Sequence, residues 1–251
     1  MANLAIGIDI GGSGIKMAPV DLDTGRLAAK RMREPTPQPA TPKAVAEVIA
    51  RMMQSPDLQG IEIAGAGFPA AIKDGRPMTA ANIDKSWIGA DAREILSNAA
   101  GRDLALLNDA DAAGFAEMRF GAGKGVAGEV MMVTLGTGIG TGYFVDGRLV
   151  PNTELGHIEL RGREAEKWAA ASVREREGLS WKDWAKRVGE YLDALDRLLW
   201  LDLIIIGGGV SATPDKFLPE IKLRCPVVAA SLGNDAGIIG SALYAAEKVK
   251  K

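Results

Sequence analysis

The chain has 251 residues, of which 47% are hydrophobic and 25% are charged, with a formal net charge of −2 and a sequence pI of about 5.6. This composition supplies a sizeable core and excludes a mainly disordered chain, while the near-neutral charge gives no global attraction to nucleic acid or membranes. Cys225 is the single cysteine, which excludes an intrachain disulfide framework and a cysteine-rich zinc site, and fits a reducing cytoplasm.

The N-terminus carries no recognisable targeting signal. MANLAIGIDIGG enters a β-like run almost at once, without a basic segment ahead of an apolar core. No stretch of about 18 apolar residues occurs anywhere in the chain. We therefore expect no secretion signal, no membrane span and a cytoplasmic location.

The first half of the chain predicts a β-meander followed by alternating helices and strands. We expect strands at 4–10, 15–20 and 27–32, a helix from 42, a strand at 61–68, a helix at 92–99, a strand at 104–107 and a helix at 110–119. The helix from 42 follows Thr41, a typical helix start before proline. Its apolar residues share one face: Val45, Val48, Ile49 and Met52. The stretch 70–89 has no convincing period and is expected to be a long loop, a type of segment that is often functional.

The second half repeats this order. We expect strands at 130–135, 141–145 and 148–150, helices at 164–177 and 180–200, a strand at 201–206, a short helix from 214, a strand at 227–230 and a helix at 235–249. The repetition predicts two similar α/β lobes with a cleft between them. We place the small lobe at 1–108, with the C-terminal helix 237–251 packing back on it, and the large lobe at 109–236.

Three glycine-rich segments follow predicted strands. They read GIDIGGSGIK at 7–16, LGTGIGTG at 135–142 and IIIGGGVS at 204–211. Backbone N–H groups without side chains beside them approach a phosphate closely at such strand ends. Tight hairpins alone explain one such turn well, but they explain the alternating glycines of the second segment poorly. No Walker A pattern is present.

Asn108 and Asp109 lie between a predicted strand and a predicted helix. A free aspartate has a pKa of about 3.9, so Asp109 would be ionised at neutral pH and able to accept the proton of a hydroxyl that attacks phosphorus. The alternative interpretation is that Asp109 only caps the following helix. The two roles are compatible, and three phosphate-capable turns beside one placed carboxylate indicate phosphoryl transfer.

Six segments in register carry a family resemblance. They are DIGGSGIK at 9–16, TAANIDKSWIG at 79–89, LNDADAAGFAE at 107–117, LGTGIGTG at 135–142, NTELGHIEL at 152–160 and EAEKWAA at 164–170. In this order they resemble the ROK sugar kinases of the actin-like ATPase superfamily, most closely the polyphosphate glucokinase branch, which includes polyphosphate/ATP glucomannokinases. The resemblance covers about 4–246 and implies a ribonuclease H-like α/β fold with two lobes.

The resemblance also implies the sugar site. Asp109 would be the catalytic general base. The residues expected to bind the sugar are Asn82, Asn108, Asp109, Glu154, His157 and Glu166. His157 is the single histidine, and a lone histidine outside this context is more often structural. Asn82 and Asp84, both in the long loop, would reach the sugar or close over it, with a plain surface turn as the alternative.

The phosphate site follows from the same resemblance and from the glycine turns. The residues expected to bind phosphate are Asp9, Gly11, Gly12, Ser13, Gly14, Lys16, Gly136, Thr137 and Gly138. Asp9 would hold Mg²⁺ directly or through water. A third group resembles the segment that lies against adenosine in ATP-using relatives, with a helix-packing turn as the alternative: Gly207, Gly208 and Gly209.

A polyphosphate donor needs cations beyond the two turns. The candidates are Lys16, Lys85, Arg161, Arg163 and Lys167, each of which is otherwise a solvated surface charge. Most members of the wider family carry a cysteine-rich zinc loop where this chain has RGREAEK at 161–167, so zinc is not expected. Repressor members carry an N-terminal helix-turn-helix domain, whereas this chain starts on its first strand, so we expect no DNA binding.

The function expected from these residues is that of a cytoplasmic, homodimeric kinase that phosphorylates the 6-hydroxyl of glucose. It would use inorganic polyphosphate and also ATP as donor, with Mg²⁺. Two alternatives stay open: an ATP-only hexokinase with the same sugar site, and a non-catalytic sugar-binding regulator. The polar set does not separate glucose from mannose.

Overall fold

The computed structural model describes residues 3–249, and they fall into two compact units. The first unit contains the chain up to Ala116 and again from Asp235 onward, and the second unit runs from Glu117 to Asn234. Among the described residues, no helix combines the length and the apolar content needed to cross a bilayer.

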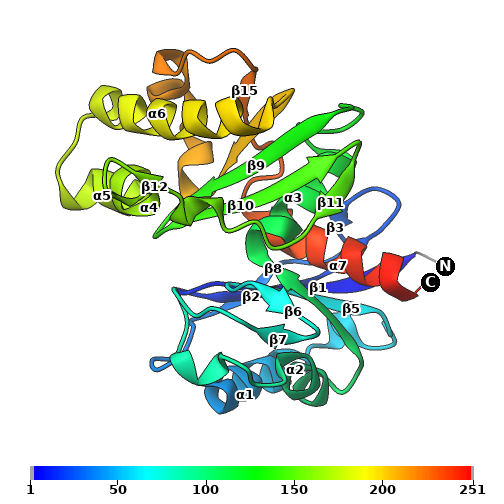
Figure 1. The fold of residues 1–251 in the computed structure, drawn as a ribbon. Helices are drawn as coiled ribbons and strands as arrows, with labels where there is room; N and C mark the ends of the chain where they lie inside the picture. The colour runs from blue at the N-terminus through cyan, green and yellow to red at the C-terminus, as the bar shows by residue number, and fades with distance from the viewer. Residues whose placement is uncertain (1–2, 250–251) are drawn as a thin grey trace. The chain divides into compact units, whose positions relative to one another are not determined.

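The first unit is built on a mixed sheet with the order β3-β2-β1-β5-β8, and β4 also pairs with β2. Its strands are β1 (Leu4–Ile10), β2 (Ile15–Asp21), β3 (Arg26–Leu27), β4 (Met32–Glu34), β5 (Ala64–Phe68) and β8 (Leu104–Asn108). β1 and β2 are antiparallel, whereas β1, β5 and β8 are parallel. Helices α1 (Pro42–Met52) and α2 (Ala92–Ala100) lie on one face and α7 (Ala236–Val249) on the other (Figure 1).

The two faces of β1 explain this layering. Ile6, Ile8 and Ile10 are fully buried in the core that α1 and α2 complete. Gly7 lies on the opposite face, where a Cβ atom would overlap the Ile238 backbone of α7. Glycine is therefore required at this position because the helix backbone crosses directly over the strand.

The second unit has a sheet with the order β11-β10-β9-β14-β15. Its strands are β9 (Glu129–Leu135), β10 (Ile139–Val145), β11 (Arg148–Val150), β14 (Leu203–Gly207) and β15 (Val227–Ala229). Trp184 and Tyr191, both fully buried on the long helix α6 (Trp181–Leu199), pack into its core. The two sheets are thus built alike. In each, the first strand of an antiparallel hairpin also pairs, along its other edge, with a parallel strand.

The remaining elements complete the described chain. They are the hairpins β6 (Ile72–Lys73) with β7 (Arg76–Pro77) and β12 (Glu159–Leu160) with β13 (Arg163–Glu164), the helices α3 (Asp109–Phe120), α4 (Glu166–Ala169) and α5 (Ala171–Arg176), and the 3-10 turns Pro56–Leu58, Lys85–Trp87, Leu155–His157, Gly209–Ala212, Pro214–Lys216, Leu218–Glu220 and Gly233–Asp235.

The α/β fold class is as predicted, and several elements match closely. β1 and β11 have the predicted bounds, and α1 is capped by the Thr41 side chain, which accepts a hydrogen bond from the Ala44 N–H group. The four apolar residues predicted to share one face of α1 are its buried residues. Periodicity and a capping residue are local signals, so the sequence alone is enough to place such elements.

Two predicted elements are wrong. The strand expected at 27–32 is two short strands, β3 and β4, which both pair with β2, so the chain must bend between them. The helix expected at 164–177 breaks at Ala170, whose backbone is extended at φ −59° and ψ 154°. The break lets the buried Trp184 Nε1 donate to the carbonyls of Ala169 and Ala170, at 3.0 and 3.2 Å.

The two units part inside α3, between Ala116 and Glu117, whereas the sequence predicts the boundary after residue 108. The first turns of α3 belong with the first unit because they pack on α7: a Cβ atom at Gly240 would overlap the Ala112 carbonyl. Residues 250–251 of the predicted C-terminal helix lie outside the described residues.

Candidate active site

The first glycine turn, residues 11–14, joins β1 to β2 and is fixed by hydrogen bonds to its carbonyl groups. All four carbonyl oxygens of the turn accept hydrogen bonds from within the protein. The pairs are Gly11 with Thr36 Oγ1, Gly12 with Gln38 Nε2, Ser13 with Arg33 Nη2, and Gly14 with the Gly11 N–H group. The carbonyl dipoles that would repel an anion at this turn are therefore engaged within the protein, which is compatible with the predicted phosphate site.

Asp9 and Lys16 lie opposite each other on β1 and β2, and form an ion pair of 2.8 Å. Asp9 also faces the start of α7, where a Cβ atom at Gly237 would come within 3.0 Å of its carboxyl carbon. The sequence assigned these two residues separate roles, a Mg²⁺ ligand and a phosphate contact. The ion pair means that Lys16 reaches a phosphate only by leaving or sharing Asp9.

Arg33 is a cation at this turn that the sequence analysis missed. Its guanidinium lies over Gly14, where a Cβ atom would come within 2.8 Å of Arg33 Nε, and it donates to the neutral Ser13 carbonyl at 3.3 Å. Arg33 lies on β4, beyond the strand predicted at 27–32, and its register partner on β2 is Lys16. A correct strand boundary would have placed it beside the turn.

Asn108 ends β8 and caps α3. Its Oδ1 atom accepts from the N–H groups of Ala110 and Asp111, at 2.8 and 3.1 Å, and its Nδ2 atom donates to the Ala70 carbonyl at 3.2 Å. Asp109 Oδ1 also accepts from Ala110 N–H, at 2.9 Å. Because Asn108 supplies most of the cap, helix capping alone does not account for the partly exposed carboxylate of Asp109.

The loop 79–89 meets the first glycine turn through its backbone. The Asn82 carbonyl oxygen lies 3.3 Å from the position of a Cβ atom at Gly12, and the Asn82 side chain is exposed. Asp84 instead caps the 3-10 turn 85–87 by accepting from Ser86 N–H at 2.8 Å, and its bonds to Ser86 lower the pKa of that carboxyl. Lys85 is exposed in the same turn. This geometry favours the surface-turn interpretation for Asp84.

The second glycine turn joins β9 to β10 and has the same construction as the first. Gly138 O accepts from Gly136 N–H at 3.0 Å, Gly136 O from Ser172 N–H at 3.0 Å, and Thr137 O from Ser172 Oγ at 2.6 Å. Ser172, near the start of α5, is a second residue that the sequence analysis missed. The two predicted phosphate turns thus share one feature, which is that other groups of the protein bond their carbonyls.

Glu154, His157 and Glu166 lie together in the second unit. Glu154 Oε2 is 3.5 Å from His157 Nε2, and Glu166 Oε1 is 3.9 Å from His157 Nδ1. The other Glu166 oxygen accepts from Ile139 N–H, directly after the second glycine turn, at 3.4 Å. The structure therefore brings this part of the predicted sugar set together and links it to a predicted phosphate turn.

The backbone under these side chains is packed onto β10. Leu155 N–H donates to Thr141 Oγ1 at 3.2 Å, and the Thr141 hydroxyl also contacts Thr153. Gly156 lies against the Ile139 carbonyl so closely that a Cβ atom would overlap it. The position of Glu154 and His157 is therefore set by the strand that follows the glycine turn.

The charges of this cluster are unequal. Burial raises the pKa of the Glu154 carboxyl, with Glu166 adding to the effect and His157 opposing it. Lys167 lowers the pKa of Glu164 through an ion pair of 2.5 Å. Within the described residues, one group of side chains is close enough to share a metal ion, with ligand atoms within 4.8 Å of one another: His157, Glu164 and Glu166.

The cations expected to extend the donor site are mostly engaged. Lys167 pairs with Glu164, and Arg161 pairs with Glu190 at 2.6 Å. Arg161 and Arg163 both lie 5.5 Å from the centre of the Trp168 ring. A cation stacked on an aromatic ring keeps its charge, so Arg163 remains a stronger candidate for an anion contact than Lys167.

The third glycine cluster ends β14. Gly208 has φ +80°, and a Cβ atom there would overlap the Leu135 carbonyl, while one at Gly209 would meet nothing within 4 Å. Gly208 is thus needed for backbone packing against the end of β9, in line with the packing-turn alternative. Gly209 is open, and Gly207 faces the Met132 side chain.

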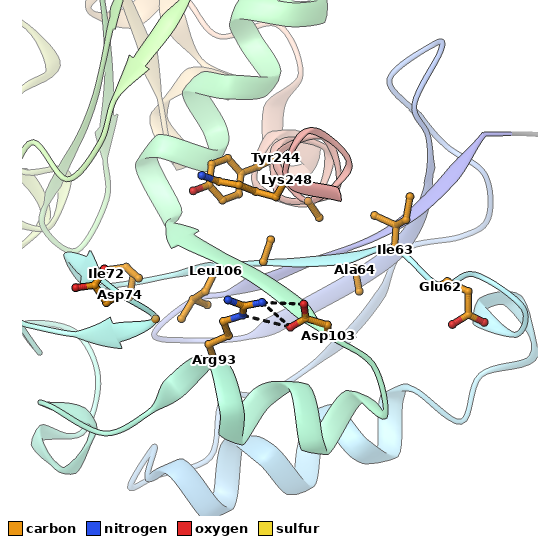
Figure 2. A pocket seen from close by; sticks show the side chains of 13 residues that line it. Glu62, Ile63, Ala64, Ile72, Asp74, Arg93, Asp103, Leu106, Tyr244 and Lys248 are labelled. Carbon is orange, nitrogen blue, oxygen red and sulfur yellow. Dashed lines mark hydrogen bonds and ion pairs between the residues drawn. The ribbon is translucent and has the colours of Figure 1, made fainter. Parts of the chain in front are cut away.

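A pocket of about 610 Å³ lies elsewhere in the first unit (Figure 2). The exposed ion pair of Arg93 with Asp103 lies on one side of it, and Tyr244 and Lys248 of α7 lie on the other. None of the predicted sugar-binding or phosphate-binding residues lines this pocket. It offers no support for the candidate site.

Comparisons with known proteins give a consistent picture. The family model described as "ROK family" matches residues 5–172. The chain is 49% identical to the polyphosphate glucokinase of Mycobacterium tuberculosis (strain CDC 1551 / Oshkosh) over 238 residues, covering 94% of this chain and 89% of that protein.

Two crystal structures match nearly the whole chain. The inorganic polyphosphate/ATP-glucomannokinase of Arthrobacter sp. strain KM superposes with a TM-score of 0.93 at 47% identity, covering 98% of this chain and 99% of that one. A ROK family glucokinase of Streptomyces griseus, in complex with glucose and AMPPNP, superposes with a TM-score of 0.83 at 25% identity, covering 98% and 100%.

Proposed function

Because the chain belongs to the ROK family, we propose that it transfers a phosphoryl group from inorganic polyphosphate to the 6-hydroxyl of glucose. The observation that carries this proposal is the near-complete match, at almost half identity, to a protein named polyphosphate glucokinase. The site geometry is compatible with it, since carbonyls of both glycine turns are bonded within the protein and the cluster of Glu154, His157 and Glu166 lies beside the second turn.

Asp109 is the general base in this proposal. It accepts the proton of the 6-hydroxyl as that oxygen attacks the terminal phosphorus of the donor, and the bond from phosphorus to the next bridging oxygen breaks. In phosphoryl transfer with a loose transition state, such a carboxylate chiefly positions the nucleophile. General base catalysis contributes a factor of about 10² to 10⁴ in rate.

The sugar hydroxyls are read by groups that accept and donate. Glu154 and Glu166 accept hydrogen bonds from hydroxyls, a neutral His157 supplies one donor and one acceptor, and the Asn108 amide supplies a donor. Asn108 Oδ1 already accepts two backbone N–H bonds and Nδ2 already donates one bond inside the first unit, so the second N–H of Nδ2 is the group that Asn108 offers to the sugar. Asn82 is the least constrained member, because its side chain is exposed.

The donor phosphates are bound by the two glycine turns, with Ser13 and Thr137 adding hydroxyl groups. Mg²⁺ belongs to this proposal: Asp9 has the carboxylate oxygens that Mg²⁺ prefers beside phosphate oxygens, and bound Mg²⁺ neutralises charge on the phosphates. In the structure the Asp9 carboxylate lies against the Lys16 ammonium. Asp9 therefore already contacts a cation, in a place that Mg²⁺ would share with Lys16 or take from it.

The cations decide between polyphosphate and ATP. We expect Arg33→Gln and Lys16→Ala to raise KM for long polyphosphate more than KM for ATP, because a polyanion contacts more charges than a nucleotide does. The ion pair of Lys16 with Asp9 makes Arg33 the cleaner variant. Raising the salt concentration should weaken the reaction with polyphosphate more than the reaction with ATP. Equal losses with both donors in the variants would show that Arg33 and Lys16 do not distinguish polyphosphate from ATP.

The test uses purified protein, glucose, Mg²⁺ and polyphosphate without nucleotide. Formation of glucose 6-phosphate supports the proposal, whereas activity with ATP alone supports the ATP-only hexokinase. Binding of glucose without turnover by any donor supports the non-catalytic regulator. Asp109→Asn should lose at least a hundredfold in kcat, while Asp103→Asn, in an exposed ion pair of the same unit, should keep it.

Three finer points belong to the proposal. Mannose, the C2 epimer of glucose, is tested as a second acceptor in the same assay. A homodimer, supported only by the family resemblance, is tested by light scattering coupled to gel filtration. A cytoplasmic location is supported by the single, buried Cys225, which leaves no intrachain disulfide to form.

A further inference from the structure

The His157 imidazole is surrounded by three carboxylates, and one of them has no place in the proposed sugar set. Glu154 faces Nε2 at 3.5 Å, while Glu164 and Glu166 face Nδ1 at 3.7 and 3.9 Å. Nδ1 is buried from solvent and makes no hydrogen bond within the described residues at these distances. A buried polar nitrogen without a partner is costly, so a small movement of one carboxylate toward Nδ1 is favoured.

Glu164 is built to make that movement. It ends β13, and the hairpin with β12 places it opposite Glu159. One of its oxygens is held by Lys167 Nζ at 2.5 Å, which leaves Oε1 as the oxygen that faces His157 Nδ1. Glu166 is less available because its second oxygen is directed at Ile139 N–H. We propose that Glu164, fixed by Lys167, accepts the Nδ1–H hydrogen bond and keeps the imidazole proton on Nδ1.

The position of this proton decides whether His157 can serve a substrate. If the proton sits on Nε2, the ring donates to Glu154, and both groups are withdrawn from a sugar hydroxyl. If the proton sits on Nδ1, Nε2 keeps a lone pair, and Nε2 and Glu154 together form a pair of acceptors for hydroxyl groups. Glu164 is thus a positioning residue for glucose, a role that rests on the proposed function.

Nuclear magnetic resonance tests this directly, because His157 is the only histidine in the chain. Long-range ¹H–¹⁵N correlation spectra of the ¹⁵N-labelled full chain, without sugar and at pH 8.5, report which ring nitrogen of a neutral imidazole carries the proton. We expect protonated Nδ1 in the unaltered protein and a shift toward protonated Nε2 in Glu164→Ala. Glu159→Ala, the matched control on the facing strand, should keep the original spectrum.

Kinetics supply the second readout. Glu164→Ala should raise KM for glucose about tenfold while kcat stays within about threefold, and KM for polyphosphate should not change. Glu164→Gln, which keeps an oxygen acceptor, should restore part of the loss. Equal losses in Glu159→Ala, or an unaltered spectrum in Glu164→Ala, would overturn the role of Glu164.

A shared metal ion is the competing explanation for the cluster. A nitrogen signal of Nδ1 that changes on adding a chelator, or on adding Zn²⁺ alone, would overturn the proposal in favour of a metal. If the unaltered protein does not convert glucose with polyphosphate, the proposed function fails, and the spectra still decide the role of Glu164.

Discussion

Replacing Gly156 by alanine tests whether β10 positions the turn that carries Glu154 and His157 of the proposed sugar site. A Cβ atom at Gly156 would lie 2.2 Å from the Ile139 carbonyl oxygen, and real Cβ atoms keep at least 3.0 Å from such a neighbour. The turn and the Ile139 carbonyl must therefore separate by at least 0.8 Å, the difference between these values. Because His157 N–H bonds the Glu154 carbonyl at 3.1 Å across this turn, both side chains move with it.

The size of the effect follows from this displacement. A misplacement of about 1 Å costs on the order of a hundredfold in rate when it affects reacting or positioning groups, which corresponds to about 2.7 kcal/mol of transition-state stabilisation. We therefore expect kcat/KM for glucose to fall about a hundredfold in Gly156→Ala. KM for polyphosphate should change much less, because the second glycine turn itself is not substituted.

Gly189→Ala is the matched control. Gly189 lies inside α6, where a Cβ atom meets only Ile221 at 4.0 Å. The same chemical change there should stabilise the protein by about 0.5–1 kcal/mol and leave kcat/KM unaltered. Thermal unfolding of both variants separates a local displacement from a loss of folding. A folded Gly156→Ala enzyme that keeps kcat/KM within threefold would refute the claim that this backbone contact positions Glu154 and His157.

Three further outcomes are expected. Burial raises the pKa of Glu154 above the usual 4.5, so this carboxyl takes up its proton at a higher pH than an exposed glutamate does. The loss of kcat/KM for glucose at acidic pH should therefore begin above pH 4.5, and this loss should be absent in Glu154→Gln. Burial raises the pKa of Cys225 to about 11, so its thiol stays protonated at neutral pH, and thiol reagents should label it only when denaturant unfolds the protein. Trp87→Phe should lower the free energy of unfolding in urea by about 1–3 kcal/mol. The reason is that Nε1 of the fully buried Trp87 donates to the Ala40 carbonyl at 2.8 Å, and phenylalanine cannot replace this bond. An unchanged midpoint would show that the carbonyl finds another partner.

Elements with a strong local signal could be predicted from the sequence. The isoleucines of β1 alternate with Gly7 and Asp9, and α1 has both a capping residue and an apolar stripe. The errors arose where a distant residue decides the backbone. At the break, Trp184 from another helix donates its single indole N–H to the carbonyls of Ala169 and Ala170. No periodicity in the segment itself records that contact.

The candidate site divides in the same way. The places of the glycine turns could be predicted because glycine content is a property of the segment. The groups that bond the carbonyls of the turns could not, since Thr36, Gln38 and Ser172 carry no signal that links them to a turn far away in the chain. The side chains that bond the carbonyls of these turns are therefore known only once the chain is folded.

The cations show why composition is a poor guide to a polyanion site. Lys16, Arg161 and Lys167 each lie within 2.8 Å of a carboxylate, so part of their charge is already balanced. Arg33 instead donates to a neutral carbonyl of the first glycine turn, a contact that does not balance its charge. The loss on removing a cation should follow this difference: Arg33→Gln removes a net attraction, whereas Lys167→Gln also frees Glu164 and so acts on the sugar side. A larger effect of Lys167→Gln on KM for glucose than on KM for polyphosphate would separate the two roles.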